Sequence, residues 1–517
     1  MNRHVPGDGL PAYSGTMSET PAATPTADAV PLGVRVGELA AARGDVPAVI
    51  CGDEARSWAE LDRRTNQLAR ALAERGVAQG GFVTIGLPNG IEFIEACIAC
   101  WKIGAVPQPV SSRLPALELH AIVELADPAV VVAAADLSLD RPVVGVADLL
   151  AGSADDSSLP PAVSPAWKAP TSGGSTGRPK LIVSGQAGVF GELSRSAWRH
   201  RDDGVALMPG PLYHNGPFTS AFQGLMNGST LVLEVRFDAE ETLRLIEAHR
   251  VTWVYLVPAM MGRIWRLPDE VKQRHDLSSL ETVWHLAAPC PEWLKLAWIE
   301  WVGAEKIWEL YAGTEAQAST VINGAEWLEH RGSVGRVAYG EMVILDDTGE
   351  PLPPGEVGEV FLRRSPGTPP SYRYIGAEPR RHGDWESLGD VGWFDTDGYL
   401  YLADRHADMI LVGGSNVYPA EVESALDEHP GVRSSCVIGL PDDDLGNVVH
   451  AIIQADASLD LDDLRAHLDQ RLVRYKHPRT FEIVAEPLRD DAGKMRRSAL
   501  RAERLARQDA ATGGGGS

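Results

Sequence analysis

The sequence of 517 residues predicts an α/β fold, with a large N-terminal domain of mixed sheets and helices and a small α+β C-terminal domain. Short apolar runs alternate with helical patterns through most of the chain, which is typical of βαβ units with mainly parallel sheets. After residue 355 the strands become shorter, and Gly/Pro turns separate them. At roughly 100–200 residues per domain, the length fits two to four domains.

Both ends of the chain are predicted to lie outside the folded core. Residues 1–32 are rich in Pro, Ala, Ser, Thr and Gly without periodicity, so we expect a disordered tail. Residues 513–517 read GGGGS, which is typical of an engineered linker, and we assign 510–517 to a tail. The large domain is then expected over 33–404 and the small domain over 405–509.

Apolar periodicity predicts the elements of the large domain in order. Residues 58–76 place Leu61, Leu68 and Leu72 on one helical face, and Gly76 favours a helix stop. The other predictions are strands at 82–87, 129–134, 230–234 and 252–257, and helices at 92–103 and 239–249.

The last third of the chain predicts shorter elements. Residues 419–428 begin with Pro419, which is favoured in the first turn of a helix. The remaining predictions are strands within 355–363, at 398–404 and at 436–440, and a helix at 461–472.

The charge balance excludes some classes of protein. Lys+Arg 47 against Asp+Glu 71 gives a net charge of −24, which argues against a nucleic-acid-binding protein. An anionic substrate is still possible, because a few buried cations and backbone N–H groups can hold a phosphate. No stretch approaches the ~20 apolar residues of a membrane helix, and no signal-peptide profile is present.

The sequence has five cysteines, an odd number without zinc-ribbon spacing. Cys97 and Cys100 lie one turn apart inside an apolar helical pattern. This position favours core packing over a redox pair. We therefore expect a protein of the reducing cytoplasm.

Residues 171–180, TSGGSTGRPK, give the strongest indication of chemistry. Glycines let the backbone approach a ligand closely and adopt positive φ. Hydroxyls and exposed N–H groups then form a concavity of donors that suits phosphate oxygens. The spacing is not that of a Walker A loop. The candidate phosphate ligands are Thr171, Ser172, Gly173, Gly174, Ser175, Thr176, Gly177 and Lys180.

Two alternatives remain for this segment. It could be a flexible polar linker, although Lys180 leads directly into an apolar run. The residues around Ser175 also match G-x-S-x-G, the nucleophile elbow of α/β-hydrolases, which needs a strand before it and a helix after it. Here Pro170 precedes the loop, Pro179 follows it, and the next run is strand-like, so the context disfavours a serine hydrolase.

The loop resembles the phosphate loop of the adenylate-forming superfamily, which includes acyl-CoA synthetases, luciferases and peptide-synthetase adenylation domains. The resemblance covers about residues 33–509. Further motifs follow in the order of that family: MPGPLYHNGPF at 208–218, HLAAPCP at 285–291, ELYAGTE at 309–315, GDVGWFDTDGYL at 389–400 and DAGKMRR at 491–497.

The resemblance implies a site for ATP, Mg²⁺ and a carboxylic acid. His214 would lie near the acyl pocket and gate the carboxylate. Tyr311 would stack on adenine, Thr314 would contact phosphate, and Glu315 would hold Mg²⁺, a cation that prefers carboxylate and phosphate oxygens. Ala312 stands where many relatives carry Gly and could narrow the acyl pocket. The adenine-facing loop would comprise Ala287, Ala288 and Pro289.

The resemblance also implies a small C-terminal domain that moves. Lys494 would bridge the carboxylate and the α-phosphate, and rotation of the domain would then withdraw it. Position 407, where relatives usually carry Asp or Lys, would be the hinge; here it is Ala407. The ribose would contact Asp390 and Arg405, and the pantetheine tunnel would be lined by Gly413 and Gly414.

By this resemblance the protein converts a carboxylic acid and ATP into an acyl-adenylate with release of pyrophosphate, and then passes the acyl group to coenzyme A. Bacterial acid–CoA ligases are the most similar group. Transfer to an amine, as in stand-alone amide bond synthetases, is the alternative, and a non-catalytic nucleotide sensor is a further one. Five aromatic residues suggest a bulky or ring-containing acid, or else core packing: Tyr213, Phe218, Phe222, Trp284 and Trp308.

Overall fold

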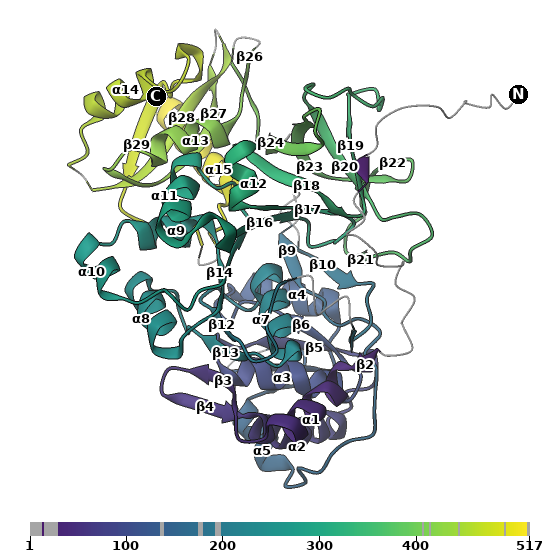
Figure 1. Ribbon diagram of the computed structural model, residues 1–517. Coiled ribbons are helices and arrows are strands. Elements are labelled where there is room, and N and C mark those ends of the chain that lie inside the picture. The colour runs from purple at the N-terminus through teal and green to yellow at the C-terminus, as the bar shows by residue number, and fades with distance from the viewer. Residues whose placement is uncertain are drawn as a thin grey trace, which may run out of the picture.

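The structure is a computed structural model, drawn as a ribbon in Figure 1. It describes residues 13–14, 29–134, 139–173, 179–191, 198–405, 408–412, 415–442, 445–456, 458–490 and 493–513. Within these ranges no helix has both the length and the apolar character needed to cross a membrane.

A parallel sheet forms the N-terminal part of the large domain. Its strand order is β6 (Val106–Pro109), β5 (Phe82–Gly86), β7 (Val130–Ala133) and β8 (Val143–Val144). The helices of this part are α1 (Leu32–Arg43), α2 (Trp58–Glu74), α3 (Ile91–Lys102), α4 (Ala116–Ala126) and α5 (Val146–Gly152).

Local sequence explains where α2 and α3 form. Helix α2 begins with a capping box, in which the Ser57 hydroxyl accepts from the Glu60 N–H and the Glu60 carboxylate accepts from the Ser57 N–H. Gly76, with φ +86°, follows its last turn. Helix α3 is buried along almost its whole length, and the unpaired Cys97 and Cys100 are 0% exposed. The prediction that these two cysteines belong to the core is confirmed.

A much longer sheet runs through the large domain (Figure 1). One half is parallel apart from its edge strand, in the order β16 (Ile307–Ala312), β15 (Thr282–Leu286), β14 (Trp253–Leu256), β12 (Val205–Met208), β13 (Thr230–Leu233), β3 (Pro47–Cys51) and the antiparallel edge β4 (Glu54–Ser57). The antiparallel half continues from β16 through β17 (Ser319–Asn323), β18 (Ser333–Tyr339), β24 (Tyr399–Arg405), β23 (Trp385–Phe394), β20 (Gly358–Arg363), β19 (Glu341–Leu345) and β1 (Tyr13–Ser14), with β22 (Arg380–His382) beside β23.

Helices connect the parallel strands as successive βαβ units, as the alternating pattern predicts. Helix α7 (Asn215–Asn227) links β12 to β13, α8 (Ala239–His249) links β13 to β14, and α9 (Pro258–Trp265) with α10 (Asp269–Arg274) links β14 to β15. Helix α11 (Glu292–Val302) and the short helix η1 (Ala304–Lys306) lead to β16, and α12 (Gly324–Glu329) follows β17.

A small antiparallel sheet holds the segment predicted to bind phosphate. Its strand order is β21 (Tyr372–Ile375), β10 (Pro179–Ser184) and β9 (Thr171–Gly173). The phosphate segment is therefore the start of a β-hairpin, and a strand rather than a helix follows it. A nucleophile elbow needs a helix at that place, so the following strand speaks against the serine hydrolase alternative.

The C-terminal part has its own apolar core, which includes Val422, Leu426, Val437, Ile453 and Leu464. It packs beside α9 and α11 in Figure 1, where it is coloured light green to yellow. Its elements are β25 (Ile410–Val412), β26 (Ser415–Val417), α13 (Pro419–Asp427), β27 (Val432–Asp442), β28 (Gly446–Ala455), α14 (Leu461–Asp469), η2 (Arg474–Lys476), β29 (Thr480–Val484) and α15 (Arg497–Gly513).

Most predicted elements are confirmed with shifted bounds. The helix at 239–249 has the predicted bounds, because Asp238 accepts from the N–H groups of Glu240 and Glu241 and Arg250 ends the helix at φ 49°. The strand predicted at 436–440 is too short, since β27 pairs with β28 over a longer ladder. The helix predicted at 461–472 is too long.

The two predicted tails need correction where the structure describes them. Within 1–32, β1 pairs with β19, β2 (Val30–Pro31) pairs with β11 (Val189–Phe190), and the buried Leu32 starts α1. Sheet edges offer free N–H and C=O groups, so these short segments can pair without apolar periodicity. At the other end, α15 extends through residue 513, into the predicted tail. Residues 514–517 lie outside the described residues.

Candidate active site

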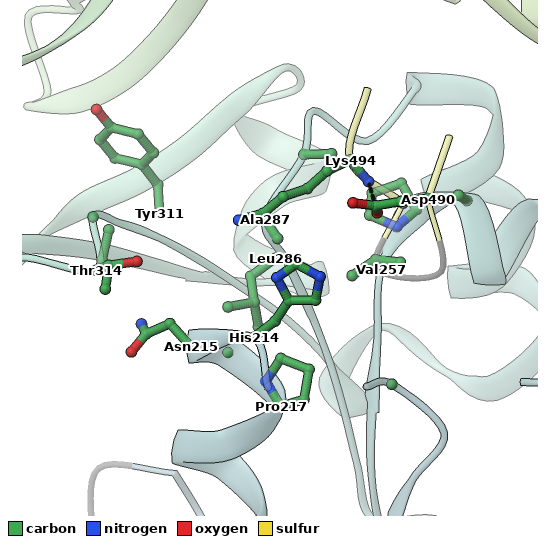
Figure 2. Close-up of a pocket in the computed structure, with 18 of the residues that line it drawn as sticks. His214, Asn215, Pro217, Val257, Leu286, Ala287, Tyr311, Thr314, Asp490 and Lys494 are labelled. Atoms are coloured by element: carbon green, nitrogen blue, oxygen red, sulfur yellow. Dashed lines mark hydrogen bonds between the residues drawn. The ribbon is translucent and has the colours of Figure 1, made fainter. Parts of the chain in front are cut away.

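Four loops of the site follow the carboxyl ends of four neighbouring parallel strands. The strand order β16, β15, β14, β12 places Thr314, Ala287, Val257 and His214 next to one another in that order. In open α/β sheets this edge is where ligands bind. In Figure 2, Tyr311 and Thr314 lie at one side, Ala287 and His214 lie nearer the middle, and Val257 lies at the other side.

These loops line one large cleft with a volume of about 3120 Å³. That volume is several times the ~300–1,000 Å³ of a pocket for one ligand. The cleft brings together most of the predicted site residues: Thr171, Ser172, Lys180, His214, Ala287, Ala288, Pro289, Tyr311, Thr314, Glu315, Asp390 and Lys494.

The adenine and ribose candidates lie at one side of the cleft. The Tyr311 hydroxyl donates to Asp390 Oδ2 at 2.7 Å. Asp390 in β23 stands opposite Arg405 in β24, so the two predicted ribose contacts are neighbours in the antiparallel ladder. Ala287 adopts φ +76° at the end of β15. This left-handed backbone costs an L residue about 1–2 kcal/mol, and such strain is typical of functional sites.

A chain of hydrogen bonds holds the start of the phosphate hairpin against the N-terminal sheet. The Thr84 hydroxyl donates to Gln108 Oε1 at 2.6 Å, and Gln108 Nε2 donates to Thr171 Oγ1 at 2.8 Å. Because Thr171 accepts this bond, its own O–H can donate into the cleft. Residues 174–178, which include the predicted phosphate ligands Gly174, Ser175, Thr176 and Gly177, lie outside the described residues, and Gly173 is described as backbone only.

Glu315 is buried at the base of the hairpin. Its Oε1 accepts from the Tyr374 hydroxyl at 2.5 Å, and Lys180 Nζ lies 3.6 Å from the same oxygen. The Lys180 ammonium also lies 3.9 Å from the centroid of the Tyr374 ring. Burial raises the pKa of Tyr374, with Glu315 adding to the effect, so this phenol stays a donor. The other Glu315 oxygen can bind a cation such as Mg²⁺, which uses one or two protein carboxylates together with substrate phosphates.

His214 caps the N-terminus of α7 and faces Lys494 (Figure 2). Its Nε2 is buried and has no hydrogen-bond partner among the described residues. Burial, with a smaller contribution from the Lys494 ammonium, lowers the pKa of His214 to about 3. The imidazole is therefore neutral near pH 7 and has a polar atom available to a ligand.

Lys494 reaches the cleft on a turn of the C-terminal part. The Gly493 N–H donates to the Asp490 carbonyl, and the Lys494 N–H donates to Asp490 Oδ1 at 2.9 Å. Gly493 adopts φ +73°, and a Cβ atom there would lie 3.0 Å from Val257 Cγ2. Glycine is therefore needed both for the turn and for its close approach to the large domain.

A second contact holds the C-terminal part in this position. Arg266, at the end of α9, donates to the carbonyl of Asp427 at 3.0 Å and to that of Arg433 at 3.2 Å. Asp427 is the last residue of α13, where the helix dipole favours a cation. Ala407, Gly413 and Gly414 lie outside the described residues, and Arg405 is described as backbone only.

Of the two interpretations of the five aromatic residues, core packing holds for most of them. Of the five aromatic residues, Tyr213 lines the cleft and the other four do not. Phe218 and Phe222 pack with Trp101 in the core, and Trp284 packs with Trp308. Large apolar side chains fill cores first, and a sequence does not separate core from pocket. Ala312, in contrast, lines the cleft, as does its neighbour Gly313.

Several residues that line the cleft were not predicted from the sequence. They include Lys168, Asn215, Val257 and Tyr374. Val257 could have been found, because it is the last residue of the predicted strand 252–257 and follows β14 as Ala287 follows β15. Asn215 directly follows His214 in the same motif. Lys168 and Tyr374 carry no local signal, since only tertiary contacts bring them to the cleft.

Comparisons with known proteins agree with this architecture. Residues 37–372 match the family model of AMP-binding enzymes, and residues 421–494 match that of the AMP-binding enzyme C-terminal domain. A feruloyl-CoA synthase of an Amycolatopsis species is 34% identical over 477 residues, which cover 88% of this chain and 95% of that protein.

Two solved structures are informative. O-succinylbenzoate coenzyme A synthetase of Bacillus subtilis, in complex with ATP and a magnesium ion, has a TM-score of 0.77 and 25% identity, covering 90% of this chain and 98% of that one. The amide bond synthetase McbA of Marinactinospora thermotolerans has a TM-score of 0.74 and 28% identity, covering 92% and 99%. The chain therefore belongs to the family of AMP-binding enzymes and is an AMP-forming acid ligase.

Proposed function

We propose that this ligase activates an aromatic carboxylic acid with ATP and passes the acyl group to coenzyme A. The proposal rests on one observation. A single cleft is lined by Lys494, His214, Thr314 and the base of the phosphate hairpin. Feruloyl-CoA synthase, at 34% identity, supports both an aromatic acid and coenzyme A as acceptor.

In the first step the carboxylate attacks the α-phosphorus of ATP. Both reactants are anionic, so the site must neutralise charge and hold the attack in line. We assign this role to Lys494, to the Thr314 hydroxyl and to the donors of the phosphate hairpin from Thr171 onward. His214, neutral near pH 7, would contact the carboxylate and separate it from water.

Adenine would stack on Tyr311, against Ala287, Ala288 and Pro289. The ribose hydroxyls would donate to Asp390, whose carboxylate already accepts from Tyr311. Glu315 would hold Mg²⁺, which when bound supplies positive charge to the phosphates. Tyr374 and Lys180 fix the Glu315 carboxylate in place for this task.

The second step needs the acceptor to reach the adenylate. We propose that the C-terminal part rotates to remove Lys494 and that Gly413 and Gly414 then line the path of the thiol. A change of position of this kind is a domain-closure mechanism. We also propose a cytoplasmic location, which the unpaired cysteines support.

A second candidate acceptor is an amine. The similarity to McbA, which covers 92% of this chain, favours this candidate. Both acceptors attack the same adenylate carbonyl, so the first half-reaction would be unchanged.

The test is a product screen by mass spectrometry. The protein is incubated with ATP and Mg²⁺, a panel of ferulic, benzoic and fatty acids, and either coenzyme A or simple amines. A feruloyl or benzoyl thioester supports the proposal. Amide products in the presence of both acceptors would identify the amine, and pyrophosphate release with fatty acids alone would refute the aromatic acid.

A further inference from the structure

Lys168 is a buried lysine on the wall of the cleft. Its side chain is 7% exposed. The residue stands three positions before the phosphate hairpin, where its carbonyl accepts from the Ser184 N–H at 3.0 Å. Its ammonium donates to Asn215 Oδ1 and, at 2.5 Å, to Thr219 Oγ1, both in the first turns of α7. The Trp167 ring lies 4.2 Å from the same ammonium. All of these partners are neutral.

The structure offers a direct comparison in Lys102, a second buried lysine. The Lys102 ammonium is 2.5 Å from Asp62 Oδ1 and from Asn66 Oδ1, so its charge is paired. For Lys168 no carboxylate among the described residues contributes, and burial alone lowers its pKa to about 7. An unpaired buried cation is costly, and a methionine would fill similar space without that cost. We therefore expect the charge of Lys168 to interact with an anion that binds in the cleft.

Lys168 also determines how the Asn215 amide is oriented. An ammonium group can only donate, so the Asn215 oxygen must face Lys168 and its nitrogen must face away. Figure 2 shows the Asn215 nitrogen on the side of Thr314 and the oxygen turned away from it. The two Nδ2–H donors are thus presented toward Thr314, in the cleft where the carboxylate and the α-phosphate are proposed to meet.

We propose that Asn215 and Lys168 form one anion-recognition unit of the adenylation site. Asn215 Nδ2 donates to an anionic oxygen of the reactants, and Lys168 is the positioning residue that orients this amide and adds positive potential. The oxygen belongs either to the α-phosphate of ATP or to the carboxylate of the acid. The inference rests on the proposed function, because the reacting groups are placed by it.

The test compares Lys168→Met, Asn215→Asp and Lys102→Met with the parent. Pyrophosphate release is measured while ATP and the acid are varied separately, and thermal unfolding is followed for each protein. Lys168→Met should lose about 10- to 100-fold in kcat/KM, the range for a hydrogen bond to a charged group. Its Tm should equal or exceed that of the parent, because an unpaired buried charge is removed.

Asn215→Asp keeps the contact with Lys168 as an ion pair but removes the donor, so it should fold normally and lose activity to a similar extent. Lys102→Met is the matched control. It leaves the half-buried Asp62, whose side chain is 15% exposed, without its partner, and should lower the Tm while its kinetic constants stay those of the parent. A rise in KM confined to ATP assigns the oxygen to the phosphate, and one confined to the acid assigns it to the carboxylate.

Two outcomes would contradict the proposal that Lys168 and Asn215 act together. One is a Lys168→Met variant that unfolds earlier with unchanged kcat/KM, which would make the lysine structural. The other is parental activity in Asn215→Asp. If the proposed function itself is wrong, the experiment gives a different result, because the parent protein then releases no pyrophosphate with any acid.

Discussion

The two walls of the cleft are built in different ways. On the large-domain side, side-chain hydrogen bonds fix each group: Gln108 holds Thr171, Tyr374 holds Glu315, and Tyr311 holds Asp390. On the opposite side, Lys494 sits on a turn that approaches the large domain at Gly493, and Arg266 reaches backbone carbonyls of the C-terminal part. The first wall is part of a folded core, whereas the second is a docked surface.

The difference indicates which kinetic constant each wall controls. The adenine and ribose contacts of the fixed wall hold ATP in the same way before and during the reaction, so their loss raises KM. A docked wall that supplies charge at the reacting centre acts mainly in the transition state, so its loss lowers kcat. The following variants test this division, in order of decreasing effect.

Lys494→Ala removes the charge that the docked wall delivers. We expect adenylate formation to fall by about 100- to 1000-fold, the range for a lost electrostatic group at a reacting centre, with ATP binding largely intact. Pyrophosphate exchange measures the first quantity and calorimetry the second. Pyrophosphate exchange at the parental rate would show that Lys494 takes no part in the reaction.

Asp390→Ala tests the fixed wall. Its carboxylate accepts from Tyr311 and is proposed to accept from the ribose, so we expect the KM for ATP to rise by about 10- to 100-fold with a small change in kcat. Steady-state kinetics at saturating acid measures both constants. An unchanged KM for ATP would contradict the ribose assignment.

Gly493→Ala tests how closely the two walls must approach. The added Cβ would press on Val257 at 3.0 Å, so we expect about a tenfold lower adenylation rate as Lys494 is displaced. Gly446→Ala is the control, because Gly446 has a similar φ of +75° with nothing within 4 Å of the new atom. Both variants carry the same left-handed strain, and equal activity in the two would show that the approach is not needed.

Arg266→Ala should have the smallest effect. It removes two hydrogen bonds to carbonyl oxygens from the docked wall, and we expect adenylation to slow about fivefold without a change in the KM for ATP. Arg201→Ala, which loses only exposed ion pairs to Asp203 and Glu281, should behave as the parent. A higher KM for ATP in Arg266→Ala would contradict the assignment of kcat to the docked wall and of KM to the fixed wall.

Much of this organisation could be predicted from the sequence. The alternating pattern at 230–257 predicted two strands and a helix of the parallel sheet, and the motif resemblance placed His214 and Ala287 in one site. The same resemblance identified Lys494 through its motif DAGKMRR at 491–497. These features depend on local periodicity and on short motifs, which a single sequence carries.

Other parts required the structure. Lys168 meets Asn215 across an interval of 47 residues, and Tyr374 meets Glu315 across 59, through tertiary contacts that no local pattern encodes. The two interpretations of the aromatic residues, acid pocket or core packing, could not be separated for a related reason. The burial of Phe222 and Trp284 depends on tertiary packing that the sequence does not show. Long-range pairing and packing decide these cases.

The two hydrogen bonds from Arg266 to the C-terminal part have a consequence for evolution. Both oxygens that it holds belong to the main chain, and every residue type offers the same carbonyl there. The side chains of the C-terminal part can therefore change at this junction during evolution without loss of these hydrogen bonds. A transplanted C-terminal part from a relative should be accepted, provided that its first helix stops at the equivalent place.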